Sequence, residues 1–71
     1  MNFGENFKKC RLEMHLSQKE VASKLGIHQS NISDWENDIS RPEYENLIHL
    51  AEIYNVSLCQ LLGIDENFYI K

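Results

Sequence analysis

Apolar residues recur along this chain with the period of amphipathic helices. Over residues 3–14 they fall at intervals of four, three and four, at Phe3, Phe7, Cys10 and Met14. Similar periodicity predicts four further helices, over residues 18–25, 29–37, 44–54 and 58–62. No stretch alternates apolar and polar residues with period two, so we predict no strands and an all-α fold of five helices.

Residues that start and stop helices stand at the ends of these segments. Ser17 with Glu20, and Ser57 with Gln60, fit the capping box, in which a serine oxygen accepts the amide proton of the third helical residue and that residue's side chain reaches back. Residues suited to a left-handed exit follow four of the helices: His15, Gly26, Asn55 and Gly63. The helices are therefore predicted to be short and sharply bounded.

The length bounds the domain count. The 71 residues leave room for one domain over 1–71, with a core over about 3–62 and a tail over 63–71. The start, MNFGENFKKC, has no apolar signal segment, and no apolar run approaches the roughly 18 residues of a membrane span. We expect a soluble, cytoplasmic protein. In a cytoplasmic protein we expect Cys10 and Cys59 to stay reduced. Both cysteines fall among apolar residues at helical spacing, which favours a role in buried packing over a reactive thiol.

The charge balance limits the class of partner. Seven Lys and Arg stand against eleven Asp and Glu, giving a net charge of -4 and a pI near 5.2. This sign excludes broad adhesion to polyanions by bulk charge. It leaves open a small local footprint on nucleic acid, because net charge does not report where the charges lie.

The second and third predicted helices, joined by a tight turn at Gly26, have the spacing of a helix-turn-helix over about 17–37. The stretches SQKEVASKLGIHQSNISDWENDISRP and LIHLAEIYNVSLCQLL resemble the phage repressor/Cro (XRE-type) helix-turn-helix family, and the resemblance covers roughly residues 3–62. It implies a five-helix lambda-repressor-like DNA-binding domain and a regulator of transcription.

The resemblance also implies a structural ion pair. Arg11 and Glu36 occupy positions that pair internally in that family. A partly buried bidentate pair would fix the third helix to the scaffold. The alternative is that both are surface ions that contribute little to stability.

The same resemblance implies which residues meet DNA. The start of the third helix and the turn after it would face bases, through His28, Gln29, Ser30 and Asp34. Gln can pair with adenine, Asp can accept from cytosine and Ser can serve several base edges, so an A- and C-containing half-site is expected. The alternative is a polar face that is merely solvated.

Phosphate contacts are implied at both ends of the motif. The candidates are Gln18, Lys19, Asn37, Ser40 and Arg41. Two departures from the family weaken the attraction to phosphate: Asp38 stands where glycine is usual, and no Lys or Arg lies between Leu25 and Arg41. We expect modest affinity unless Arg11 neutralises Glu36, and a dimer could compensate by doubling the contacts.

The expected partner is a roughly palindromic double-stranded DNA operator, bound by a homodimer that represses by occlusion, with its two third helices about 10 bp apart. The expected dimer surface is apolar and C-terminal: Leu58, Leu62, Ile64, Phe68, Tyr69 and Ile70. The alternative for Phe68 to Ile70 is that they cover the monomer core.

A protein-interaction module of the same fold is the main rival. An antitoxin-like or anti-repressor partner could use the acidic surface against a basic protein. We expect no enzyme, cofactor, membrane or small-molecule substrate. His15, His28 and His49 lack metal-ligand spacing with the cysteines, and no catalytic signature or Gly-rich phosphate loop is present.

Overall fold

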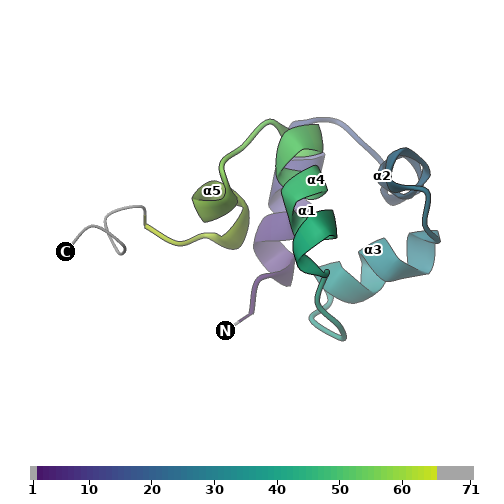
Figure 1. The fold of residues 1–71 in the computed structure, drawn as a ribbon, viewed down its shortest axis with the longest axis horizontal. Helices are drawn as coiled ribbons and strands as arrows, with labels where there is room; N and C mark the ends of the chain where they lie inside the picture. Colours follow the sequence, from purple (N-terminus) through teal and green to yellow (C-terminus); the bar gives the residue numbers. More distant parts are fainter. Residues whose placement is uncertain (1, 66–71) are drawn as a thin grey trace.

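The computed structural model describes residues 2–65. These residues form five helices: α1 (Gly4–Glu13), α2 (Gln18–Leu25), α3 (Gln29–Glu36), α4 (Tyr44–Tyr54) and α5 (Leu58–Leu62). Within that span there is no strand, which confirms the predicted all-α class (Figure 1). None of these helices is long and apolar enough to cross a membrane.

The predicted helix boundaries hold to within one residue. Both capping boxes are formed, since the Ser17 and Ser57 hydroxyls accept backbone N–H groups and the Glu20 and Gln60 side chains accept the serine N–H groups. The hydrogen bonds from Ser17 lower the pKa of Glu20. All four predicted left-handed exits have positive φ, at His15, Gly26, Asn55 and Gly63. Local signals in the sequence therefore set the starts of α2 and α5 and the four left-handed exits.

The prediction for Met14 is wrong. Its spacing places it on the apolar stripe of α1, yet it is 41% exposed. The helix ends at Glu13, and Met14 is the residue that terminates it, with φ near -89° and ψ near 2°. Because the chain leaves helical geometry there, the helical spacing no longer places the side chain over the core.

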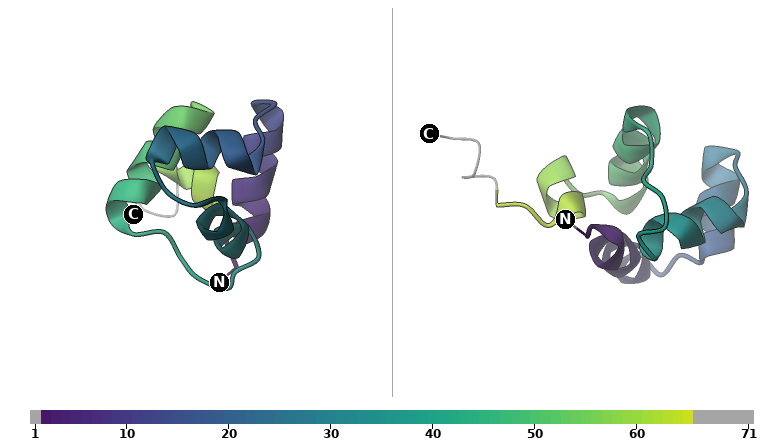
Figure 2. Two further views of the ribbon diagram at one scale, coloured as in Figure 1. Left: turned by 90° about the vertical axis from the view of Figure 1, so that its right-hand side faces the viewer. Right: turned by 90° about the horizontal axis from the view of Figure 1, so that it is seen from below.

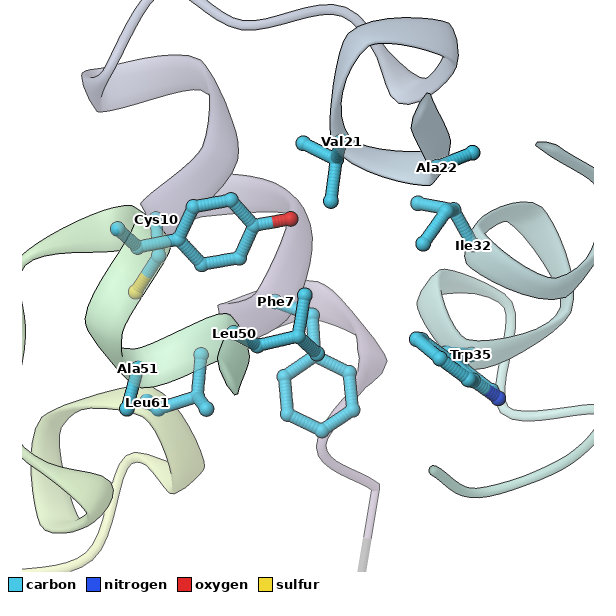
Figure 3. Close-up of a cluster of buried hydrophobic side chains, with 10 residues drawn as sticks. Phe7, Cys10, Val21, Ala22, Ile32, Trp35, Leu50, Ala51 and Leu61 are labelled. Carbon is cyan, nitrogen blue, oxygen red and sulfur yellow. The ribbon is translucent and has the colours of Figure 1, made fainter. Parts of the chain in front are cut away.

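The core draws on all five helices. In Figure 1, α1 and α4 lie in the middle of the molecule, with α2 and α3 at one end and α5 at the other. The buried side chains form one cluster, in which Ile32 lies beside Val21 and Ala22 and Phe7 lies near Leu50 (Figure 3). Each large apolar side chain buried in this way contributes about 1.5–3 kcal/mol. The third helix, α3, which is the candidate for contacting DNA, is thus packed on the same core as the other four helices.

Both cysteines are expected from the sequence to be buried packing residues. Cys10 is buried, as expected, whereas Cys59 is only half-buried. Burial raises the pKa of the Cys10 thiol. A thiol in this state is a poor nucleophile, so Cys10 serves as a packing residue.

The start of α1 rests directly on the end of α3. A Cβ added at Gly4 would lie 2.3 Å from the carbonyl oxygen of Glu36 and 2.7 Å from that of Trp35. Both obstacles are backbone atoms, which cannot move aside as a flexible side chain can. The lack of a side chain at Gly4 is what lets the two helices meet.

We predict that Gly4→Ala destabilises the fold by about 1–3 kcal/mol, the usual cost of overpacking. The sign is informative, because alanine normally stabilises a helix relative to glycine by about 0.5–1 kcal/mol. Urea unfolding of the variant measures the change. Lys8→Ala, on the exposed side of the same helix, is the control and should stay within about 0.5 kcal/mol of the unsubstituted chain. An equally stable Gly4→Ala variant would contradict the close approach.

Candidate nucleic-acid interface

The third helix presents a polar outer face from a fixed position. The turn before it is tight, with Gly26 at φ 69° and the Ile27 N–H donating to the Ala22 carbonyl. On its inner side Ile32 and Trp35 are 1% and 6% exposed. On its outer side Gln29 and Ser30 are exposed, and the turned view in Figure 2 shows α2 and α3 together at this end of the molecule. The outer face is therefore accessible without unfolding the core.

An ion pair joins the C-terminal end of α3 to α1. Arg11 Nε donates to Glu36 Oε2 at 2.7 Å and Arg11 Nη2 to Glu36 Oε1 at 2.9 Å. Arg11 Nη1 also donates to the Leu16 carbonyl at 2.9 Å. The two residues are only 7% and 9% exposed, which excludes the alternative of two surface ions. The bidentate geometry fixes the orientation of α3 on the scaffold.

The electrostatics around the pair follow from its burial. The hydrogen bond to Glu36 raises the pKa of Arg11 against the opposing effect of desolvation. Tyr54 is buried nearby, and its pKa is raised strongly, first by desolvation and then by the charge of Glu36. Both shifts keep the arginine charged and the phenol neutral over the whole physiological range.

Two glutamine amides extend this network to the surface. Gln18 Nε2 donates to Glu36 Oε1 at 3.0 Å, and Gln29 Nε2 donates to Gln18 Oε1 at 3.4 Å. Because Glu36 can only accept, it turns the Gln18 amide so that its oxygen faces Gln29. Gln29, whose side chain is exposed, then gives one N–H to Gln18, which leaves its other N–H and its carbonyl oxygen for another partner. The buried pair is thereby linked through Gln18 to an exposed residue at the start of α3.

The phosphate candidates lie beyond both ends of α3. At one end Gln18 is half-buried at the first position of α2 and Lys19, next to it, is exposed. Past the other end Ser40 and Arg41 are exposed, with the Arg41 guanidinium carbon 5.4 Å from the centre of the Phe3 ring. A duplex lying along α3 would find hydrogen-bond donors on both sides of the polar outer face of α3.

Asn37 is the least suited of the five phosphate candidates. Its side-chain amide donates back to α3, to the Ser33 carbonyl at 2.8 Å and to the Ser33 hydroxyl at 3.3 Å. Its backbone N–H also donates to the Ser33 carbonyl. The donors that a phosphate would need are thus engaged within the protein.

Ser33 lies among the candidate residues, although the sequence analysis did not select it. It lies one turn after Gln29 and is half-buried, between the first turn of α3 and Asp34, which is also half-buried. His28 precedes the helix and is exposed, without a side-chain capping bond. The i to i+4 relation to Gln29 would have identified Ser33.

The expected dimer residues are only partly described. Leu58 is 43% exposed, Leu62 and Ile64 are half-buried, and Leu62 packs against the core. Phe68, Tyr69 and Ile70 lie outside the described residues. Across residues 2–65 no group of three His, Cys, Asp or Glu side chains could hold a metal ion.

Two short helices joined by a tight turn, with the second helix exposing a polar face, define a helix-turn-helix DNA-binding domain. In this chain the two helices are α2 and α3, and a buried ion pair holds α3 against α1. The chain belongs to the helix-turn-helix family, whose profile matches residues 7–61.

Similar proteins are regulators of transcription. The chain is 41% identical over 66 residues to the HTH-type transcriptional regulator ImmR of Bacillus subtilis (strain 168). The aligned region covers 93% of this chain and 52% of ImmR. It is 29% identical to the HTH-type transcriptional activator BcrR of Enterococcus faecalis, over 93% of this chain and 32% of BcrR. It is 28% identical to the cryptic phage CTXphi transcriptional repressor RstR of Vibrio cholerae, over 90% of this chain and 58% of RstR. The chain spans about half the length of the first of these relatives.

We predict that Glu36→Gln destabilises the fold by about 3–5 kcal/mol, because it leaves the Arg11 charge buried without its counter-ion. Thermal unfolding followed by circular dichroism measures the loss. Glu13→Gln removes an exposed carboxylate from α1 and is the matched control.

A double variant separates the loss of the pair from a loss of packing. Arg11→Met with Glu36→Leu leaves no buried charge, so it should recover much of the stability that Glu36→Gln loses. If Glu36→Gln unfolds at the same temperature as Glu13→Gln, the pair does not fix α3 in the manner argued above.

Proposed function

We propose that this chain binds a specific site in double-stranded DNA with α3 in the major groove and acts as a repressor of transcription. The observation that carries the proposal is the exposed polar start of α3, at His28, Gln29 and Ser30, held on the core by the buried ion pair. A helix presented in this way fits the width of the major groove. Ser33 and Asp34 continue the same face and complete the proposed reading surface.

Occlusion is the simplest mechanism for a small regulator, since a protein seated on a promoter excludes the polymerase. The relatives' names support regulation in both directions, because RstR is named as a repressor and BcrR as an activator. We favour repression, since activation needs a second surface that contacts the transcription machinery. The cytoplasmic location expected from the sequence stays a prediction.

We propose that two copies bind together, with their α3 helices in successive major grooves about 10 bp apart. The low density of positive charge supports this proposal, since one copy engages few phosphates and a second doubles the number. Leu58, Leu62 and Ile64 are the described residues expected to contribute to the dimer surface. A symmetric pair would read a roughly palindromic operator.

Gln29 is the residue most closely fitted to one base. Its Oε1 can accept from the N6 amino group of adenine while its second N–H donates to adenine N7. Guanine presents two acceptors at the same edge, and chelating it would require both N–H groups of the amide. One of these is already donated to Gln18, at 3.4 Å. The glutamine network therefore favours adenine over guanine.

We predict that replacing the adenine opposite Gln29 by guanine in the best-binding duplex weakens binding by about 1–3 kcal/mol, the usual value for one base contact. Gln29→Ala should weaken binding to the adenine duplex and remove most of this discrimination. Fluorescence anisotropy titrations of both proteins with both duplexes give the four affinities needed. Equal preference for adenine in the unsubstituted chain and in Gln29→Ala would assign the reading of that base to another residue.

Selection from a random duplex pool at two salt concentrations tests the proposed function itself. We expect an enriched palindromic sequence and a log–log salt slope of about -0.9 for each phosphate engaged. The variant Gln29→Ala with Arg41→Ala should lose the enrichment. Its control is Lys24→Ala, which removes one positive charge as Arg41→Ala does, from a residue that lines a hollow with His49 and Glu52 of α4.

Failure to enrich any sequence at low salt would refute DNA binding. It would favour the interaction module that the net charge of -4 suits, in which the acidic surface receives a basic protein. Enrichment of a single, non-repeated half-site would instead retain DNA binding and refute the dimer.

A further inference from the structure

The carboxylate of Asp38 closes the amino end of a helix far from it in the sequence. Asp38 Oδ1 accepts the backbone N–H of Gly4 at 2.9 Å and that of Phe3 at 3.1 Å. Phe3, at the N-cap position of α1, provides no side-chain capping bond of its own. Asp38 therefore supplies, from the loop after α3, an acceptor for backbone N–H groups that have no partner within α1.

The backbone at Asp38 allows this contact. Its φ is 59°, in the left-handed region, where Asp and Asn are better tolerated than most residues. The Ile39 N–H donates to the Asp34 carbonyl at 2.9 Å, so the turn after α3 is closed by its own hydrogen bond. The side chain of Asp38 then reaches the first turn of α1 rather than the reading face of α3.

Three contacts join the same two short segments. The Glu36 carbonyl lies against Gly4, the Asp38 carboxylate accepts from Phe3 and Gly4, and the Arg41 guanidinium lies over the Phe3 ring at 5.4 Å. The last turn of α3 and the loop after it are thus held against the start of α1, and the two segments lie side by side in Figure 2. The loop that carries Ser40 and Arg41 is thus attached to the start of α1 by these contacts.

The charge of Asp38 has two opposite effects on a nearby phosphate. A carboxylate in this loop repels the DNA backbone through space. Here, however, it accepts two N–H groups at the positive end of the α1 dipole, equivalent to about half a unit charge, so part of its field is offset. Whether Asp38 helps or hinders DNA binding depends on whether ordering of the loop outweighs the remaining repulsion.

We propose that Asp38 is a positioning residue for the loop of residues 38–41, which it clasps to α1 so that Ser40 and Arg41 meet the DNA backbone in an ordered geometry. This inference rests on the proposed function. Arg41 makes the contact with phosphate, and Asp38 acts only through the placement of the loop. Without the clasp the loop loses its attachment to Gly4, and each phosphate contact must be ordered at the moment of binding.

Two variants of equal charge separate the clasp from simple repulsion. Asp38→Asn and Asp38→Gly both remove the negative charge, and both residues tolerate a φ near 59°. Only asparagine keeps a side-chain oxygen that can accept from Phe3 and Gly4. A role as a repelling charge predicts the same gain in DNA affinity for both variants, whereas a role as a clasp predicts different results.

We expect the Gly4 amide, followed by NMR hydrogen exchange without DNA, to keep its protection in Asp38→Asn within about three-fold and to lose about ten-fold in Asp38→Gly. On the enriched duplex, Asp38→Asn should bind at least as tightly as the unsubstituted chain with the same salt slope. Asp38→Gly should bind about five- to ten-fold more weakly than Asp38→Asn, with a slope smaller by about 0.9, the value of one phosphate contact.

The measurements are made well below the melting temperature of each variant, so a purely structural role would lower that temperature and leave the salt slope unchanged. Equal affinity and equal slope in the two variants would overturn the inference while leaving the proposed function intact. If the unsubstituted chain enriches no duplex at all, the proposed function and this inference fail together.

Discussion

The buried ion pair between Arg11 and Glu36 is the interaction on which the rest of the arrangement depends. It crosses 25 residues of sequence to fasten the last residue of α3 to the last turn of α1. Burial of a charged pair is costly unless each group is hydrogen-bonded, and here the guanidinium also binds the Leu16 carbonyl while the carboxylate also accepts from Gln18. The pair therefore contributes more to the placement of α3 than to net stability.

That placement explains how an acidic chain can present a nucleic-acid interface. Of the three carboxylates between Asp34 and Asp38, Glu36 is paired with Arg11 and Asp38 accepts from the start of α1. Asp34 is half-buried and is the member of this group that belongs to the proposed reading surface. Hydrogen bonding by uncharged groups, led by Gln29 and Ser30, then faces the field of one carboxylate rather than three.

Much of the fold could be predicted from the sequence because its signals are local. A serine and its partner three residues on determine where α2 and α5 begin, and a residue that tolerates positive φ determines where a helix ends. The ion pair came from the family resemblance. The Asp38 clasp and the orientation of the Gln18 amide could not be predicted, since each joins segments that only the folded chain brings together. The inward turn of Asn37 was missed for a different reason: its contact is local, but the family role assigned to Asn37 pointed outward.

The position of Asp34 has a consequence for the kind of selectivity such an interface achieves. A carboxylate on the reading face gains a hydrogen bond where it meets a cytosine amino group and meets repulsion where a base presents only acceptors. With no Lys or Arg between Leu25 and Arg41, little non-specific attraction is available to offset that repulsion. In the proposed complex, wrong sequences are therefore rejected more strongly than the right one is held. Selectivity of this kind comes from a low affinity for competing DNA, and it is compatible with modest affinity for the operator.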